Sequence, residues 1–283
     1  MSLLRHIRLC NEWNAADFVP FLHETARVGW IRRANAERLA RFPKVFEVSR
    51  ERVRLIAAGD RAALTRAIDD ATEALVADGA IPKWRQEYFA VAARWGAAPR
   101  FDLDRGAVPF FGVRAYGVHL NGWRRDGGKL RQWIGRRAAG KMIAPDKLDN
   151  LVAGGIGGDY GLEKTLFKEA EEEASMPEDL TARAVAVGAV TYRMATEDGV
   201  RDDILFLYDC ETPPDFTPRN TDGEIVSFAL MDAEDVVERM RRTDDFKFNV
   251  NLVNIDFALR HGVVPPGDPE YLDLVTGLHR PLD

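Results

Sequence analysis

Residues 154–177 read GGIGGDYGLEKTLFKEAEEEASMP, a glycine-rich run that passes directly into a helical pattern and then stops. We expect a helix over residues 162–174. Glu169, Glu172 and Glu173 are related as i, i+3 and i+4, so their carboxylates share one face of that helix. Like charges at this spacing repel, and the carbonyl end of a helix already carries partial negative charge. This face therefore requires either full solvation or a cation.

Two explanations of the acidic face stay open at this point. One is an ordinary solvated surface, and the other is a hard divalent cation, because Mg²⁺ prefers carboxylate oxygens and shares them with substrate phosphates. Five glycines between residues 154 and 161 would let backbone groups approach an ion or a phosphate closely. The run lacks the GxxxxGK[ST] pattern of a P-loop, and Tyr160 occupies the third glycine position of a GxGxxG motif. The glycines and the acidic face together favour a metal-assisted phosphate site.

The sequence around this helix contains short segments with strand patterns, separated by turn residues. Asp198-Gly199 is a strong hairpin signal between two of them. Two further helices are expected over 233–240, behind Asp232 as N-cap, and over 251–260, ended by Gly262. The expected strands cover residues 112–120, 130–135, 148–152, 184–193 and 204–208. Strands flanked by a few helices predict a mixed α/β sandwich.

The first hundred residues have a different pattern. The predicted elements are a helix over 17–42 broken near Gly29, a strand or hairpin over 44–56, an amphipathic helix over 61–77 and a short strand over 87–91. Residues 97–109, AAPRFDLDRGAVP, show no sustained periodicity. We therefore predict an accessory domain over residues 1–108 and a second domain over 109–283.

Composition narrows the class of protein. The 283 residues carry a net charge of −6, so no basic footprint for nucleic acid or anionic lipid is visible at whole-chain level. Cys10 and Cys210 do not form a disulfide framework, and neither a secretory signal nor a membrane-length apolar run is present. We expect a soluble cytoplasmic protein that binds neither nucleic acid nor membrane. Its oligomeric state stays open, with a homodimer as one option.

Residues 154–176 resemble the Nudix box, G-x5-E-x7-R-E-U-x-E-E-x-G-U. Aligned without gaps, Gly154, Glu169, Ala170, Glu172, Glu173 and Met176 match the pattern. Tyr160 replaces the early glutamate, Lys168 replaces the arginine and Ser175 replaces the late glycine. The glutamates of the metal-binding core are all retained.

The resemblance extends over nearly the whole chain, to the Nudix branch linked to thiamine pyrophosphokinases. The segments that carry it are 28–33, 42–48, 83–91, 110–123, 133–156, 216–231 and 246–264. It implies an α+β protein, in which a Nudix α/β/α sandwich with a mixed sheet follows a smaller α+β N-terminal domain. It also implies a Mg²⁺-dependent enzyme, with Mn²⁺ as the alternative ion. The implied substrates are small molecules of thiamine-diphosphate type, including damaged oxo and oxy forms, which are cleaved to the monophosphate and phosphate.

The same resemblance assigns roles to the acidic face. Glu172 and Glu173 are the first candidates for metal ligands. Glu169 is either a third ligand or the base that deprotonates the attacking water. Lys168 takes the place of the family arginine and would orient Glu169, although it could equally be an ordinary i,i+4 partner of Glu172. A backbone carbonyl near residues 153–154 is the expected neutral ligand.

Candidate substrate-binding residues lie just before the helix. Arginine forks match phosphate oxygens, so the basic cluster just upstream of the glycines is a candidate, and a solvated patch is its alternative. The full candidate set is Arg136, Arg137, Lys141, Asn150, Gly154 and Gly155. Weaker candidates are Glu224 as a further acid, His119 as a catalyst, and Trp84 and Phe248 as stacking rings.

Two other functions stay open. One is hydrolysis of another nucleoside-diphosphate-linked substrate, or an isomerase of isopentenyl diphosphate type. An isomerase would use a cysteine near the substrate, and neither Cys10 nor Cys210 is suitably placed. The other is a non-catalytic ligand sensor, which the departures at Tyr160 and Lys168 permit but which would not need three facing glutamates.

Overall fold

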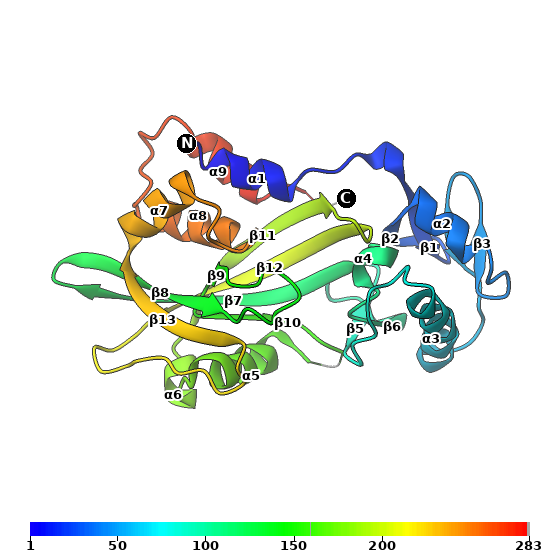
Figure 1. Ribbon diagram of the computed structural model, residues 1–283, viewed down its shortest axis with the longest axis horizontal. Helices are drawn as coiled ribbons and strands as arrows, with labels where there is room; N and C mark the ends of the chain where they lie inside the picture. The colour runs from blue at the N-terminus through cyan, green and yellow to red at the C-terminus, as the bar shows by residue number, and fades with distance from the viewer. Residues whose placement is uncertain (159, 282–283) are drawn as a thin grey trace.

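The computed structural model describes residues 1–158 and 160–281, and its centre is a mixed sheet covered by helices on both faces (Figure 1). The strand order is β11-β12-β7-β8-β13, with β10 paired to β7 and β9 to β8. The strands are β7 (Arg114–Asp126), β8 (Lys129–Arg137), β9 (Leu148–Asp149), β10 (Val152–Gly155), β11 (Val185–Ala195), β12 (Val200–Glu211) and β13 (Ile225–Asp232). The β12–β7 pair is parallel and the other pairs are antiparallel.

Helices form the two outer layers. On one face lie α5 (Leu162–Ala174) and α6 (Glu178–Thr181). On the other lie α7 (Ala233–Arg242), α8 (Val250–Arg260), α9 (Tyr271–Leu278) and the N-terminal α1 (Leu4–Cys10). This arrangement confirms the predicted α+β class and α/β/α sandwich. The hairpin between β11 and β12 is also confirmed, because Thr196 and Gly199 exchange backbone hydrogen bonds across the predicted turn.

Helix α5 has the predicted bounds, and its end has a definite cause. Ser175 adopts a left-handed conformation with φ of 48°, and the Met176 amide then donates to the Ala170 carbonyl. This is the backbone pattern that usually places glycine after a helix. The family glycine at this position is therefore explained, and serine holds the same turn while its hydroxyl donates to the Arg219 carbonyl. Pro177 follows the turn and precedes α6.

The N-terminal region is a second α+β unit. It contains η1 (Ala15–Asp17), β1 (Phe18–His23), β2 (Ala26–Arg32), α2 (Arg33–Leu39), β3 (Phe46–Val48), β4 (Val53–Leu55), α3 (Arg61–Ala77), β5 (Tyr88–Val91), β6 (Phe101–Asp104) and α4 (Val108–Phe111). Four of the strands form one sheet in the order β2-β1-β4-β3, and β5 pairs with β6. The predicted hairpin over 44–56, the helix over 61–77 and the strand near 87–91 are confirmed.

The predicted helix over 17–42 is wrong. Most of this segment forms the antiparallel hairpin of β1 and β2, which turns at Glu24 with φ of 56°. A helix is present only in α2. The hairpin is more stable than the predicted helix because it buries the apolar side chains of β1 in the N-terminal core. Gly29 also brings the backbone against α4, where a Cβ would lie 2.5 Å from the Phe111 carbonyl oxygen.

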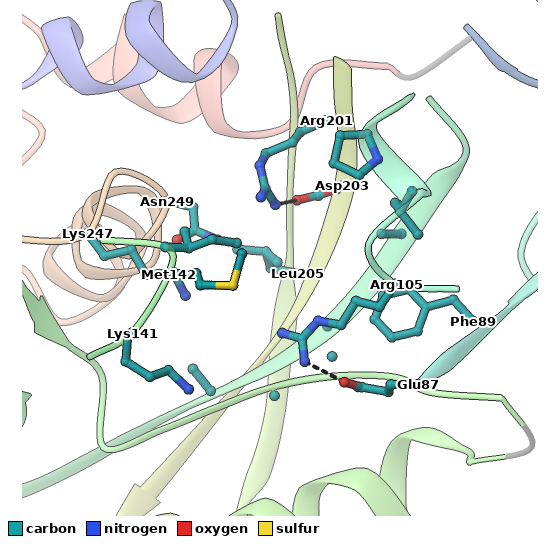
Figure 2. Close-up of a pocket in the computed structure, with 18 of the residues that line it drawn as sticks. Glu87, Phe89, Arg105, Lys141, Met142, Arg201, Asp203, Leu205, Lys247 and Asn249 are labelled. Carbon is teal, nitrogen blue, oxygen red and sulfur yellow. Dashed lines mark hydrogen bonds and ion pairs between the residues drawn. The ribbon is translucent and has the colours of Figure 1, made fainter. Parts of the chain in front are cut away.

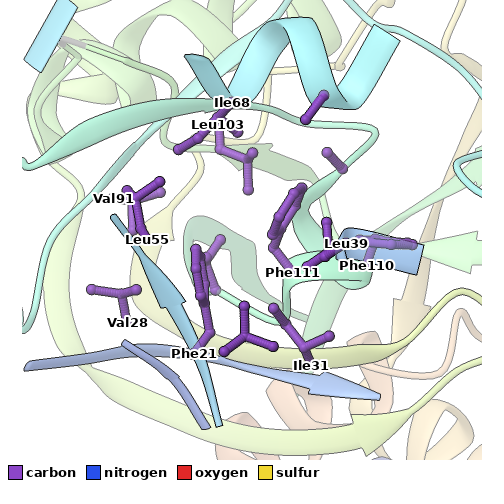
Figure 3. Close-up of a cluster of buried hydrophobic side chains, with 14 of the residues drawn as sticks. Phe21, Val28, Ile31, Leu39, Leu55, Ile68, Val91, Leu103, Phe110 and Phe111 are labelled. Carbon is purple, nitrogen blue, oxygen red and sulfur yellow. The ribbon is translucent and has the colours of Figure 1, made fainter. Parts of the chain in front are cut away.

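The N-terminal core gathers around Phe21, Ile68 and Phe111 (Figure 3). It extends into α4 and to Val113, past the predicted boundary at residues 108 and 109. In the other direction, α1 leaves this unit and packs on α9, where a Cβ on Gly277 would lie 2.9 Å from Cγ2 of Ile7. The domain limits stay a prediction. Among the described residues, no helix has the length and apolar character needed to cross a membrane.

Candidate active site

A cavity of about 420 Å³ lies where the N-terminal region meets the central sheet (Figure 2). Its walls come from β5, the β6–α4 turn, β7, the loop after β8, β10, β12 and the segment before α8. Seven basic side chains line it: Lys83, Arg85, Arg105, Arg137, Lys141, Arg201 and Lys247. Three acidic ones accompany them: Glu87, Asp203 and Glu224. The cavity is therefore suited to an anionic ligand.

Glu173 is the most unusual carboxylate at this site. Its side chain comes from α5 but reaches β10, where Oε2 accepts a hydrogen bond of 2.7 Å from the Ala153 amide. Only 3% of the residue is exposed. Burial, and then the charge of Asp149, raise the pKa of Glu173 well above its usual range. A buried carboxylate of this kind is costly unless a cation compensates it.

Glu169 and Glu172 share a different partner. Lys168 places Nζ 2.6 Å from Oε2 of Glu172 and 3.3 Å from Oε1 of Glu169. Partial burial opposes the shift, but the hydrogen bond to Glu172 and the charge of Glu169 raise the pKa of Lys168. Burial raises the pKa of Glu169. The sequence left open whether Lys168 orients Glu169 or pairs with Glu172. In the structure it contacts both.

The glycine run is fitted to this helix. A Cβ on Gly154 would lie 2.3 Å from Cγ of Glu169, so a side chain at 154 would displace the glutamate. A Cβ on Gly155 would lie 2.8 Å from Cζ of Phe89. These contacts explain two of the five glycines by close approach. Asp159, within the same run, lies outside the described residues.

The carboxylates suit a hard divalent ion. Glu173 is buried without a cationic partner among its hydrogen bonds, and Glu169 and Glu172 present oxygens on the same helix. Within residues 1–158 and 160–281, no three His, Cys, Asp or Glu side chains already converge as a metal cluster. The ammonium of Lys168 lies between two of the expected ligands. The predicted ligand set of Glu169, Glu172 and Glu173 stays a prediction.

Asp149 contacts two of the residues that line the cavity, Arg137 and Lys247, and both compensate its charge. Arg137 donates to it at 2.7 Å and Lys247 lies 3.7 Å away. Although burial opposes it, the charge of Lys247 and then of its other basic neighbours lowers the pKa of Asp149. Arg137 also donates to the carbonyls of Ile143 and Ala144, so it shapes the loop after β8.

The structure separates the predicted substrate-binding residues into two groups. Those that line the cavity are Arg137, Lys141, Gly154 and Gly155. Arg136 instead donates to the Asp146 carbonyl on the exposed side of the loop. Asn150 is buried in an amide network with His119, Asn121 and Asn254. Neither Arg136 nor Asn150 lines the cavity.

The weaker candidates also divide. His119, Glu224 and Phe248 line the cavity, and Glu224 forms an ion pair with Lys141. Burial lowers the pKa of His119 to about 4, so its ring is neutral near pH 7. Trp84 packs edge-on against Tyr88 and is not a lining residue.

Several lining residues have no signal in the sequence. They are Lys83, Arg85, Arg105, Arg201, Lys247 and Asn249. They come from segments far apart in the chain and follow no spacing that a motif could capture. Lys83 and Arg85 fall inside segment 83–91, and Lys247 and Asn249 inside segment 246–264, both of which carry part of the family resemblance.

The chain matches one family model and several known proteins. Residues 2–115 match a family described as a domain of unknown function (DUF4743). The chain is 39% identical to Nudix hydrolase 20, chloroplastic, from Arabidopsis thaliana, over 96% of this chain and 76% of the relative. It is also 39% identical to Nudix hydrolase 24, chloroplastic, from the same plant, over 98% and 77%. The crystal structure of DR0079 from Deinococcus radiodurans matches with a TM-score of 0.45 and 19% identity, over 60% of this chain and 97% of that one.

The α/β/α sandwich carries a glycine run that leads into an acidic helix, the arrangement that the resemblance to the Nudix box predicts. The near full-length identity to the plant proteins shows that the chain belongs to the Nudix hydrolase family. It is a Nudix-type hydrolase. The thiamine-pyrophosphokinase-associated branch and the cytoplasmic location stay predictions.

Proposed function

We propose that the protein hydrolyses the diphosphate of thiamine-diphosphate-like compounds, with Mg²⁺ or Mn²⁺, to the monophosphate and phosphate. The observation that carries this proposal is the cavity itself. Basic side chains line it, and the glycine run on its floor abuts the acidic face of α5. A diphosphate needs positive charge around both phosphoryl groups, and a metal ion needs carboxylate oxygens beside them.

Each residue has a defined task in this proposal. Glu172 and Glu173 would hold the ion, which neutralises phosphoryl charge when bound. Glu169, whose pKa is raised by burial, accepts the proton of the attacking water. Lys168 contacts Glu169 and orients it. Lys141 binds phosphate oxygens from the loop after β8, exchanging its ion pair with Glu224 for the substrate.

The rest of the cavity favours a positively charged heterocycle as the organic part of the substrate. The rings of Phe89, Tyr116 and Phe248 line it, together with the carboxylate of Asp203. Aromatic faces attract an organic cation, whereas Asp203 already lies 4.0 Å from Arg201. Thiamine-type compounds combine such a ring with a diphosphate, and this combination supports them over a neutral nucleoside.

The test is hydrolysis of a substrate panel by the full chain with Mg²⁺, followed by phosphorus NMR. The panel contains the diphosphates of thiamine and oxythiamine, ADP-ribose and nucleoside diphosphates. We expect monophosphate products from the thiamine compounds. The matched variants are Glu173→Gln and Glu171→Gln, because Glu171 lies on the same helix but is exposed. Loss of several kcal/mol of charge stabilisation predicts a kcat roughly 100- to 1000-fold lower for Glu173→Gln only.

Other outcomes identify other functions. Turnover of ADP-ribose or a nucleoside diphosphate, with thiamine compounds untouched, would assign the enzyme to nucleoside-linked substrates. Tight binding without turnover of any compound would favour a ligand sensor. Unchanged activity in the combined Glu172→Gln and Glu173→Gln variant would remove the metal site from α5.

A further inference from the structure

Arg105 reaches the cavity from the N-terminal region, outside the Nudix sandwich. It lies in the turn between β6 and α4, and Figure 2 shows its guanidinium extending into the cavity across from Lys141. Gly154 and Gly155, at the end of β10, line the same cavity. We propose that Arg105 is a phosphate-binding residue, through which the N-terminal region completes the diphosphate site. This inference rests on the proposed diphosphate hydrolase function.

The turn that carries Arg105 is built to hold it in place. The carboxylate of Asp104 has no exposure and accepts hydrogen bonds from the amides of Arg85, Gln86 and Gly106. Arg105 itself donates its amide to the Glu87 carbonyl at 2.7 Å. These hydrogen bonds connect the segment before β5 to the turn after β6, on both sides of Arg105. Holding a binding group in its final orientation reduces the entropy lost on binding.

The same region also holds the glycine run. The Gly158 amide donates to the Tyr88 carbonyl at 2.6 Å, and the Phe89 ring covers Gly155. Arg105 lies above that ring, with Cζ 5.9 Å from its centre. The basic side chain and the backbone that approaches the phosphate are therefore positioned by one pair of strands, β5 and β6.

Arg105 also differs from the buried basic residues in how readily it can change partners. Arg137 is held by Asp149 and by two carbonyls. Arg105 pairs with Glu87 at 2.8 Å, and both side chains are nearly half exposed. Exposed ion pairs of this kind contribute little stability. A phosphate can replace Glu87 with a stronger, charge-assisted and bidentate interaction.

The experiment measures binding of inorganic diphosphate with Mg²⁺ to the full chain by calorimetry. The variants are Arg105→Ala, Arg105→Met, which keeps an aliphatic stem over Phe89, and Arg105→Lys, which keeps the charge. Arg41→Ala is the matched control. Its side chain is 47% exposed, against 45% for Arg105, and also pairs with a half-exposed acid, Asp78, but it does not line the cavity.

We expect Arg105→Ala and Arg105→Met to weaken diphosphate binding roughly 10- to 100-fold, the usual effect of losing a charge-assisted hydrogen bond. Arg105→Lys should recover part of the loss, and Arg41→Ala should bind as the wild type does. Equal binding by Arg105→Met and Arg41→Ala would overturn the assignment, as would a wild type that does not bind diphosphate. A wild type that binds diphosphate but leaves thiamine compounds intact would refute the substrate proposal and not the role of Arg105.

Discussion

Two buried carboxylates contact residues that line the cavity, and their environments are opposite. Asp149 is 2% exposed and is paired with Arg137 and Lys247, which keep its pKa below the usual range. Glu173 is 3% exposed and accepts a hydrogen bond from one backbone amide, and its pKa is raised. Within the described residues, Asp149 thus has two paired cations, whereas the hydrogen bond to Glu173 comes from a neutral amide.

The difference separates a carboxylate that stabilises the fold, Asp149, from one that is available to a bound cation, Glu173. A carboxylate that is paired inside the fold contributes to folding. A buried carboxylate without a cation weakens the fold and is retained where it binds something. Glu173 and Asp149 repel each other, so a cation beside Glu173 would relieve both.

The largest expected change in stability comes from replacing Asp149, the carboxylate that is paired with cations. Asp149→Asn leaves Arg137 and Lys247 buried beside a neutral group, which should lower the free energy of unfolding by about 3–5 kcal/mol. Urea denaturation measures this change. Asp78→Asn is the control, because it removes an exposed ion pair and should cost at most about 1 kcal/mol. Equal effects of the two substitutions would contradict the contrast.

Glu173→Gln should have the opposite sign when no metal is added. Because burial already disfavours the charged form of Glu173, the neutral glutamine should leave the free energy of unfolding unchanged or raise it by up to about 2 kcal/mol. At 100 times its Kd, Mg²⁺ should stabilise the wild type by about 2.7 kcal/mol and leave the variant unaffected. Thermal unfolding with Mg²⁺ and with EDTA measures both. A variant that Mg²⁺ stabilises as much as the wild type would place the ion elsewhere.

The smallest effect concerns a third carboxylate, Asp69 on α3. Its Oδ2 accepts a hydrogen bond from the Tyr88 hydroxyl, while burial, and the charges of nearby acids, raise its pKa to about 6. The folded chain therefore holds this proton more tightly than the unfolded chain does. The contribution of Asp69 to stability is therefore fully present below its ordinary pKa of 3.8 and is lost as pH rises through about 6.

The variant Asp69→Asn has no titratable group at this position, so its stability should not show the decline that Asp69 causes as pH rises. The midpoint of thermal unfolding of the variant, relative to wild type, should therefore increase between pH 4 and pH 7. The effect is modest because Asp69 is only partly buried. A constant difference across this range would show that Asp69 titrates normally.

The sequence predicted best where one stretch of chain carries all the information. The bounds of α5 follow from its glycines and its apolar stripe, and α3 follows from its amphipathic pattern. The wheel places Glu169, Glu172 and Glu173 together but does not distinguish them. Glu173 is buried because β10 passes beside it, and that contact is tertiary.

The remaining features depend on segments that meet only in the fold. The hairpin of β1 and β2 was predicted as a helix, because its apolar residues fit helical spacings and their burial partners lie elsewhere in the chain. Arg105 and Lys247 follow no motif, and both line the cavity although they are far apart in the sequence. Arg136, which the sequence placed in the basic cluster, instead donates to the Asp146 carbonyl and does not line the cavity.

The contact of α1 with α9 has a consequence for any attempt to treat the two halves as exchangeable parts. Leu3, Ile7 and Cys10 are buried in the same apolar cluster as Leu274 and Leu278. A gene shortened to residues 109–283 would expose that surface to water and remove Arg105 together with the strands that hold the glycine run. The first ten residues pack against the last helix, so residues 1–108 and 109–283 must be expressed and engineered together.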